Sequence, residues 1–363
     1  MRVTLGDVCE KGASNLKQSD VVNMTGEYPI YGAAGYIGNV DFYHQEKPYV
    51  AIVKDGAGIG RTTLYPAKSS VIGTMQYLLP KDNVLPEYLC YVVRHMHLEK
   101  YFTGATIPHI YFRDYKNEQF NLDSLDKQAE IVQILGKAES IILKRRKELD
   151  ELGNLVKARF VEMFGIYPAN QMGWETGKIR DTVADVRYGS SRPSVDGGKY
   201  PYLRMNNITY GGELDLSDVK RIDVPENELD KCTVRRGDVL FNRTNSKELV
   251  GKTCVYDRDE MMVLAGFVIR VRVNDRVLPE FLSAFLNTDF SKKTLSEMCK
   301  AAIGQANINA QEMQNIGLYL PPLELQRQFV QFKKQIDKSK VVVQKALDEA
   351  QTLFDSLMQQ YFG

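Results

Sequence analysis

Residues 125–165 read LDKQAEIVQILGKAESIILKRRKELDELGNLVKARFVEMFG, and this stretch decides the fold. Apolar residues recur in it at alternating steps of four and three, interrupted only at Arg145 and Arg159. This is the spacing of a heptad seam, so it predicts one long helix with a single apolar stripe. The stripe consists of Ile131, Leu135, Ala138, Ile142, Leu149, Leu152, Val156 and Met163.

A second stretch, residues 323–361, has the same character and predicts a second long helix. Pro321 and Pro322 mark its start, and Ser124 is a candidate cap for the first helix. The apolar stripe of the second helix consists of Phe329, Phe332, Ile336, Val343, Ala346, Ala350, Leu353 and Leu357. A helix of about 40 residues is about 60 Å long, and its stripe needs a partner. We expect the two helices to pair antiparallel, through an interface formed by Leu135, Ile142, Leu149, Leu152 and Val156 with Ile336, Val343, Ala350, Leu353 and Leu357.

The two helices belong to an internal repeat that covers most of the chain. Several short motifs occur twice in the same order: Tyr28-Pro29 and Tyr200-Pro201, GRTTLY (60–65) and GKTCVY (251–256), LPEYL (85–89) and LPEFL (278–282), LDKQAEIV (125–132) and LELQRQFV (323–330). Strand-like runs such as YVAIV and FVIRVRV precede each LPE motif, which should start a short helix. Each half then continues through a glycine-containing loop and a short strand into its long helix.

We therefore predict an α+β protein with two similar domains and approximate two-fold symmetry within one chain. The expected segments are a first domain at residues 1–123, a long helix at 124–165, a second domain at 166–322 and a second long helix at 323–363.

The glycine loop KDGAGIGRTTLY (54–65) resembles a nucleotide-binding loop only superficially. Gly56 and Gly60 are one residue too close for a P-loop, and Arg61 replaces its lysine. For Gly251-Lys252-Thr253, the first glycine would have to be Ser246. Strand-like residues follow both loops where a P-loop requires a helix, so both are interpreted as turns between strands.

Composition narrows the classes of function further. The five cysteines and four histidines show no metal-binding or redox spacing, so we expect no metal, no cofactor and a reducing cytoplasm. No signal peptide or membrane-spanning run is visible. The net charge is +1, so any nucleic-acid contact must use local positive charge.

Two similar but unlike domains on a rigid spacer suit duplex DNA, because dimeric DNA readers match the symmetry of their sites. A spacer of about 60 Å limits the span to roughly 18 base pairs, and unlike domains predict unlike half-sites.

In this order, the motifs resemble the specificity subunit of Type I restriction–modification systems. The resemblance rests on the duplicated domain, the polar loops after Gly104 and Gly304, LYLPPLELQRQFV (318–330) and the helix ending in Phe-Gly. The family's entry motif has Glu-Gln after the prolines, whereas this chain has Asp126-Lys127-Gln128 and Glu324-Leu325-Gln326. The resemblance implies two target-recognition domains that read a bipartite, interrupted site in double-stranded DNA. It also implies helices that serve as ruler and docking platform for two adenine-methyltransferase subunits, with a restriction/translocase subunit joining the complex.

No catalytic set can be argued from spacing, so we expect a non-catalytic subunit. Polar and cationic residues in exposed loops are the candidates for DNA contact. In the first half they are Lys54, Arg61, His109, Tyr111 and Arg113. In the second half they are Arg187, Arg192, Arg204, Asn242, Arg243, Asn245, Lys247, Lys252, Gln305 and Asn307. Arg270 and Arg272 alternate with valine and are expected on the solvent face of a strand.

Two other functions remain open at this point. A bivalent scaffold that binds proteins without reading DNA fits the near-zero net charge, and a nucleotide-binding enzyme is the alternative suggested by the glycine loops.

Overall fold

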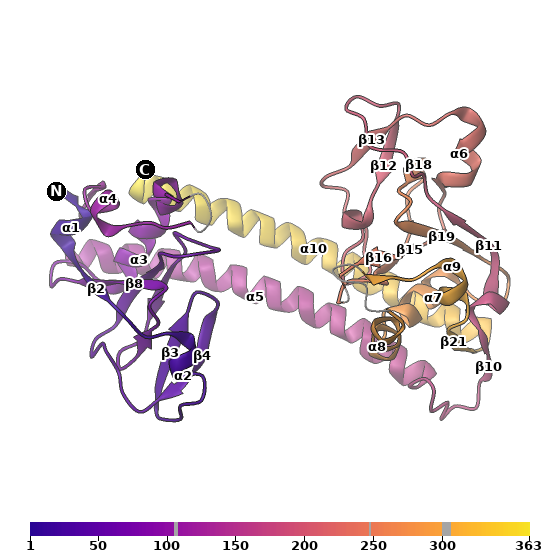
Figure 1. Cartoon of the computed structure of the whole chain (residues 1–363), viewed down its shortest axis with the longest axis horizontal. Coiled ribbons are helices and arrows are strands. Elements are labelled where there is room, and N and C mark those ends of the chain that lie inside the picture. Colours follow the sequence, from indigo (N-terminus) through magenta and orange to yellow (C-terminus); the bar gives the residue numbers. More distant parts are fainter. Residues whose placement is uncertain (105–107, 247, 300–305) are drawn as a thin grey trace. The chain divides into compact units, whose positions relative to one another are not determined.

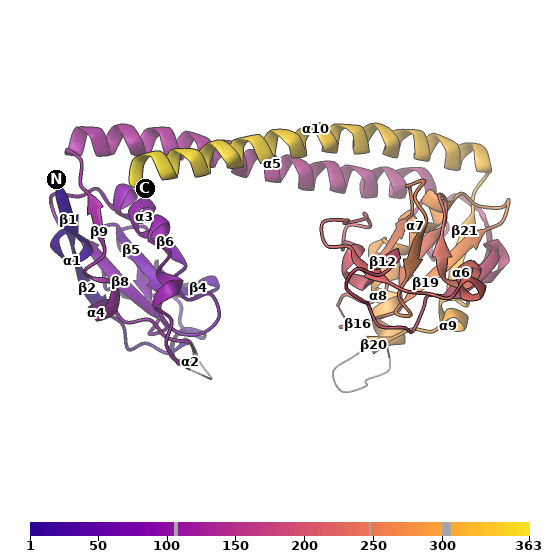
Figure 2. The same cartoon turned by 90° about the horizontal axis from the view of Figure 1, so that it is seen from above.

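The computed structural model describes residues 1–104, 108–246, 248–299 and 306–363 (Figures 1 and 2). The chain forms two compact units: unit 1 is Met1–Arg146 with Gln344–Gly363, and unit 2 is Lys147–Val343. The two long helices are α5 (Leu125–Phe164) and α10 (Leu323–Phe362), which confirms both predicted helices. Each helix contributes one part to each unit.

Unit 1 is built on a four-stranded sheet in the order β2-β8-β5-β6, a three-stranded sheet in the order β4-β3-β7, and the pair β1-β9. Its strands are β1 (Arg2–Thr4), β2 (Cys9–Ala13), β3 (Tyr28–Gly32), β4 (Gly35–Val40), β5 (Tyr49–Val53), β6 (Thr62–Tyr65), β7 (Ser70–Val71), β8 (Met75–Pro80) and β9 (Gln119–Asn121). Its short helices are α1 (Leu5–Val8), α2 (Gln18–Val21), α3 (Pro86–His95), the 3-10 helix η1 (Leu98–Tyr101) and α4 (Phe112–Tyr115).

Unit 2 has sheets in the orders β11-β19-β15-β17 and β13-β12-β18-β14, with the pairs β10-β21 and β16-β20. Its strands are β10 (Glu175–Lys178), β11 (Val183–Tyr188), β12 (Tyr200–Leu203), β13 (Lys220–Ile222), β14 (Thr233–Val234), β15 (Val239–Asn242), β16 (Thr244–Asn245), β17 (Thr253–Val255), β18 (Met262–Leu264), β19 (Val268–Val273), β20 (Ala306–Asn307) and β21 (Gly317–Leu320). Its short helices are η2 (Ile179–Thr182), η3 (Met205–Asn207), α6 (Glu226–Cys232), α7 (Pro279–Leu286), α8 (Asp289–Met298) and α9 (Ala310–Gln314).

The two units share one topology, which confirms the internal repeat. The sheet β2-β8-β5-β6 corresponds strand for strand to β11-β19-β15-β17. In both units the strand that begins with Tyr-Pro pairs parallel with a later strand, β3 with β7 and β12 with β18. Strands β6 and β17 follow the two glycine loops, so neither loop leads into a helix.

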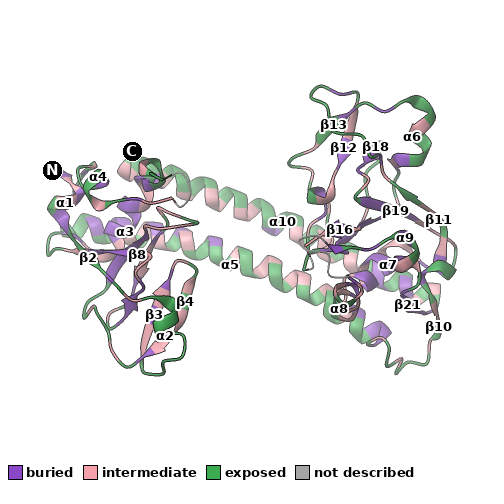
Figure 3. Ribbon diagram, in the orientation of Figure 1, coloured by how far each residue is buried: buried purple, intermediate pink, exposed green. Residues whose placement is uncertain are grey.

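The helix predicted after each LPE motif is present as α3 and α7. Both begin with proline at the first helical position, after a leucine in extended conformation. Buried residues concentrate on α3 and its sheet in unit 1, and on α7 and its sheet in unit 2 (Figure 3). Each of these helices buries its apolar face on the four-stranded sheet, and this packing forms the core.

Within each unit the long helices pack against each other in antiparallel fashion. In unit 1, Ile131 and Leu135 near the start of α5 share a core with Met358 near the end of α10. In unit 2, the ring of Phe160 near the end of α5 lies 5.3 Å from that of Phe329 near the start of α10. Of the expected interface residues, Leu135, Ile142 and Val343 are buried, and the following are half-buried: Leu149, Leu152, Val156, Ile336, Ala350 and Leu357.

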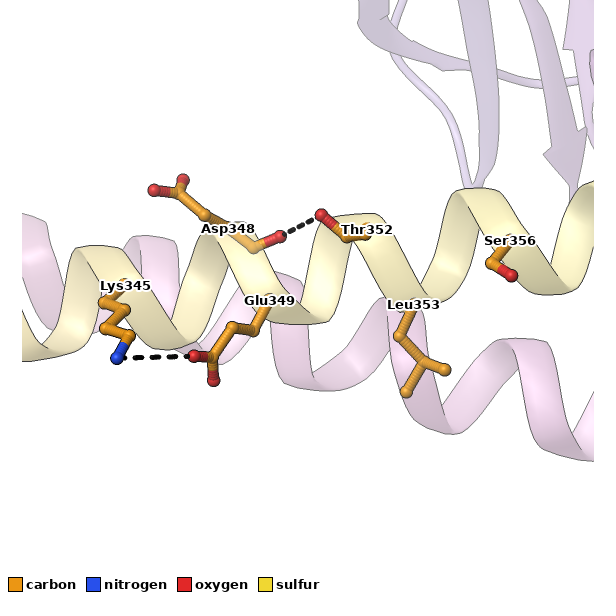
Figure 4. A pocket seen from close by; sticks show the side chains of 6 residues that line it. All are labelled: Lys345, Asp348, Glu349, Thr352, Leu353 and Ser356. Atoms are coloured by element: carbon orange, nitrogen blue, oxygen red, sulfur yellow. Dashed lines mark hydrogen bonds and ion pairs between the residues drawn. The ribbon is translucent and has the colours of Figure 1, made fainter.

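Leu353 does not belong to this interface, contrary to the sequence prediction. It is 56% exposed and lines a shallow surface hollow with Lys345, Glu349 and Thr352 (Figure 4). Phe354 packs on the core of unit 1 instead, with its ring 6.2 Å from that of Tyr91. A helix with 3.6 residues per turn drifts away from a strict 3.5 repeat, so the buried position moved by one residue.

The prediction for Arg270 is also wrong. Its side chain is only 2% exposed and donates to Asp185 Oδ2 at 2.8 Å. Arg272 lies two residues further along the same strand, on the same face, and donates to the buried Asp238 at 2.9 Å. Alternation with valine indicated one open face, but both arginines on β19 lie within ion-pair networks because further elements cover that face.

Candidate nucleic-acid interface

In unit 1, candidate residues meet where β5 ends. Lys54 follows β5 and forms an ion pair with Asp55. The imidazole Nδ1 of His109 lies 2.7 Å from Asp55 Oδ1, and the amide of Gly56 donates to Pro108 at 3.0 Å. The structure therefore brings the loop after β5 together with the segment around residue 109, although the two are far apart in sequence.

A short stack of side chains continues from this junction. The rings of His109 and Tyr111 lie 6.3 Å apart and nearly parallel, at 22°. The guanidinium of Arg113 lies 4.9 Å from the centre of the Tyr111 ring. Tyr111 and Arg113 are exposed. A flat aromatic surface edged by a cation can stack on a base or contact a phosphate.

Arg243 holds the equivalent position in unit 2. The carbonyl of Lys54 accepts from Ile110 at 3.0 Å, and the carbonyl of Arg243 accepts from Ile308 at 2.9 Å. The guanidinium of Arg243 lies 5.0 Å from the centre of the Tyr188 ring, and the Nε of Arg243 has no hydrogen-bond partner. Tyr188 is fixed in turn, because its hydroxyl accepts from the Ala310 amide at 2.9 Å. The Nε of Arg243 is buried, and Arg243 is therefore held on an aromatic ring that is itself exposed.

The neighbouring polar residues of unit 2 lie on the small ladder β16-β20. Thr244 pairs with Asn307, and Asn245 pairs with Ala306. Asn307 is exposed, whereas Asn242 is fully buried, with an amide Nδ2 that lacks a partner. The predicted residues Lys247 and Gln305 lie outside the described residues.

Arg61 and Lys252 are equivalent, and both bind a backbone carbonyl. Arg61 donates to Ala33 at 3.1 Å, and Lys252 donates to Met205 at 2.9 Å. The threonine after each cation donates to the carbonyl of the glycine before it, at 3.0 Å in both units. The two cations differ in access, because Arg61 is exposed whereas Lys252 is only 7% exposed.

The remaining candidates are engaged in ion pairs elsewhere in unit 2. Arg187 binds Asp185 at 2.9 Å, Arg192 binds Glu228 at 2.7 Å, and Arg204 binds Asp218 at 2.7 Å. Their contacts do not join them to the junction that contains Arg243. In each of these positions the carboxylate offsets part of the positive charge that the arginine could offer to a phosphate.

Sequence reasoning did not select two exposed aromatic residues near these loops. Phe267 is 52% exposed, and its carbonyl accepts from the amide of Arg243 at 3.0 Å. Tyr210 is also exposed. The available signal was an aromatic residue next to glycine in a loop, Gly266-Phe267 and Tyr210-Gly211.

In the described part of the chain, no cluster of His, Cys, Asp and Glu side chains could hold a metal ion. None of its helices is both long enough and apolar enough to span a membrane.

The chain is thus a duplicated α+β protein whose two units share two long helices. A cation follows the same strand in each unit. The chain belongs to the family described as the Type I restriction modification DNA specificity domain, which matches residues 1–153 and 172–350.

Relatives with similar sequences carry related names. The specificity subunit of the Type I restriction enzyme EcoKI from Escherichia coli is 24% identical over 222 residues, which are 60% of this chain and 47% of the relative. The MjaVIII specificity subunit from Methanocaldococcus jannaschii is 25% identical over 314 residues, 79% of this chain and 72% of the relative. The chain thus spans about half the length of the Escherichia coli relative.

Solved structures share the fold. The S subunit of a Type I restriction–modification system from M. genitalium has a TM-score of 0.58 at 14% identity, covering 100% of this chain and 96% of that one. A chain from a structure of Type I system assembly and conformational transition has a TM-score of 0.55 at 17% identity, covering 99% and 97%.

Proposed function

We propose that this chain is the non-catalytic DNA-recognition subunit of a Type I restriction–modification complex. In this proposal residues 1–123 and 166–322 are the two recognition domains, and each reads one half of a bipartite site in double-stranded DNA. Residues 124–165 and 323–363 supply the long helices that act as ruler and docking platform. Two adenine-methyltransferase subunits and a restriction/translocase subunit are the proposed protein partners, in the cytoplasm.

One observation carries this proposal: a cation follows the same strand in both units, but its identity and its neighbours differ. Lys54 is bound to Asp55 beside a histidine, whereas Arg243 lies on a tyrosine ring with an unpaired Nε. Arginine can bind two acceptors of guanine at once, and lysine acts as a point charge. Equivalent positions with unlike chemistry are what a reader of two unlike half-sites requires.

Sequencing of DNA methylation in the host tests the proposal. We expect an N6-methyladenine motif in two parts that disappears when the chain is deleted and returns when it is supplied again. Replacing the loop around Lys54 should alter one half of the motif, and replacing the loop around Arg243 should alter the other half. An unchanged methylation pattern after deletion would instead favour a protein-binding scaffold.

A further inference from the structure

Three lysines from different elements of unit 2 form a cluster outside the junction described above. Lys157 lies on α5, Lys252 follows Gly251, and Lys292 closes the first turn of α8. The ammonium of Lys292 donates to the carbonyl of Gly251 at 2.8 Å. Among the described residues, none of the three lysines has a carboxylate within ion-pair distance, and the charges that act on Lys292 are those of Lys157 and Lys252.

This arrangement is unfavourable for the fold by itself. An ammonium taken out of water needs a counter-charge, and Lys252 and Lys292 have backbone carbonyls in its place. Lys292 also sits at the helix end where the dipole is positive, which disfavours a cation. Burial lowers the pKa of Lys292 to about 8, and the charges of Lys157 and Lys252 add to this effect. An anion bound at the cluster would remove the imbalance.

The corresponding place in unit 1 contains a carboxylate. There Glu99 packs against Gly60, beside Arg61. In unit 2 the turn of α8 that carries Lys292 packs against Gly251, beside Lys252. The duplicated scaffold therefore does not require a lysine at this place, because unit 1 has a carboxylate there.

The cluster is continuous with the junction that contains Arg243. The amide of Gly251 donates to the carbonyl of Asn242 at 2.8 Å, and the amide of Asn242 donates to the carbonyl of Lys252 at 2.8 Å. Asn242 directly precedes Arg243, and its buried Nδ2 has no partner. On the solvent side, the ring of Tyr210 lies 5.5 Å from Lys292 Nζ and is 55% exposed.

We propose that Lys157 and Lys292, with the buried charge of Lys252 behind them, form a phosphate-binding site that holds the backbone of duplex DNA next to the bases approached by Arg243. The inference rests on the proposed function and adds to it a sequence-independent anchor in unit 2. Such an anchor fixes the register of the protein on the duplex without reading a base.

Lys292→Gln in the full chain, assembled with its methyltransferase subunits, tests this site. Its matched control is Lys293→Gln, because Lys293 lies on the same helix, is exposed and already pairs with Glu297 at 3.9 Å. Affinity for duplex DNA is measured against salt concentration, on specific and unrelated sequences. Each phosphate contact contributes about 0.9 to the salt slope, so Lys292→Gln should lower the slope by about one on both sequences. Between about 0.05 and 0.2 M salt, the affinity ratio of wild type to variant should fall about three- to fourfold.

Lys292→Arg keeps the charge and should retain the wild-type slope. A wild-type slope for Lys292→Gln, or an equal loss for Lys293→Gln, would overturn the site. Loss of binding to the specific sequence alone would also overturn it, because a phosphate anchor does not discriminate between sequences.

A second measurement separates DNA from free phosphate and from failure of the proposed function. Duplex DNA should protect Lys292, but not Lys293, from an amine-acylating reagent, whereas inorganic phosphate at equal phosphate concentration should not. Equal protection by inorganic phosphate would assign the site to the free ion and overturn the DNA assignment. If the wild-type complex binds no duplex at all, the proposed function itself fails and the anchor fails with it. If the complex binds DNA specifically and Lys292 remains reactive, only the anchor fails.

Discussion

Gln128 and Gln326 make the same three hydrogen bonds in the two units. Gln128 Oε1 accepts from the Leu85 amide at 2.8 Å, and its Nε2 donates to the carbonyls of Asn83 at 3.0 Å and Asp123 at 2.9 Å. Both glutamines are fully buried. Each therefore ties the start of a long helix to the leucine just before the short helix α3 or α7.

Gln326 repeats the pattern with its own partners. Its Oε1 accepts from the Leu278 amide at 2.8 Å, and its Nε2 donates to Arg276 at 3.2 Å and to Pro321 at 2.8 Å. The LPE motif and the helix-entry motif, two of the clearest repeats in the sequence, are thus direct partners. The motif glutamine therefore has a structural role in this protein, and it is present in both entry motifs, Asp126-Lys127-Gln128 and Glu324-Leu325-Gln326.

Gln326→Ala should destabilise the protein by roughly 2–4 kcal/mol, because three buried backbone groups lose their partner. Urea denaturation of the full chain measures this change. Gln331→Ala is the control, since Gln331 lies on the exposed side of the same helix. Equal urea midpoints for Gln326→Ala and Gln331→Ala would show that the side-chain amide of Gln326 contributes nothing to stability.

Phe354→Ala should lower the free energy of unfolding by roughly 2 kcal/mol, whereas Leu353→Ala should change it by less than about 0.5 kcal/mol. Phe354 packs on the core of unit 1, and Leu353 faces solvent. Thermal denaturation compares the two variants under identical conditions. A larger loss of stability for Leu353→Ala than for Phe354→Ala would instead place Leu353 in the packed interface, as the strict heptad spacing on α10 predicts.

Asp185→Ala should destabilise the protein by about 3 kcal/mol, because it leaves the buried guanidinium of Arg270 without its carboxylate. Burial of Asp185 opposes its ionisation, but Arg270 and Arg187 outweigh this effect and hold its pKa below the usual range. Asp257→Ala is the control, because the ion pair of Asp257 with Arg258 is exposed and should contribute little. Chemical denaturation near pH 7 measures both, and a loss no larger than that of the control would refute the buried pair.

Stability should rise with pH above about 8 because of Lys292. Its pKa is about 8 in the folded protein and about 10.4 in an unfolded chain, so between these values the unfolded state binds more protons. Below about pH 8 both states are protonated and the unfavourable charge is fully present.

Lys292→Met should therefore stabilise the protein at pH 7, by on the order of 1 kcal/mol or more, and should flatten the rise above pH 8. The free energy of unfolding at pH 7, 8, 9 and 10 measures this behaviour. Lys293→Met, at an exposed position, should leave the profile unchanged. An unaltered profile for Lys292→Met would mean that Lys292 is not the group responsible.

Arg243→Ala should weaken sequence-specific DNA binding by the assembled complex by about 1–3 kcal/mol and relax the choice of site at one base position. The reason is the position of the guanidinium, which packs on the exposed ring of Tyr188. Competition between specific and altered duplexes measures both effects. Arg258→Ala is the control, since Arg258 is exposed and paired with Asp257 at 3.5 Å. Unchanged affinity and site choice for Arg243→Ala would remove this junction from the interface.

The sequence by itself determined the elements that depend on local pattern. The two long helices follow from the four-three spacing of apolar residues, and α3 and α7 follow from proline at their first position. The repeat was visible because short motifs recur in one order, and the position of Lys54 and Arg243 after equivalent strands follows from that repeat. Such signals depend on neighbours a few residues apart, which the sequence displays directly.

Tertiary structure alone decided which face of each element is covered. Leu353 is exposed and Phe354 is packed, although they are neighbours on α10. Adjacent helical side chains point about 100° apart, so the surface that packs on α10 decides which of the two is buried. Arg270 is buried because Asp185, 85 residues away, reaches it. Lys252 and Lys292 form a cluster because α8 packs on Gly251. These outcomes depend on contacts between distant segments, and the free energy of burying a charge or a ring is set by those contacts rather than by the residue's own neighbours in the chain.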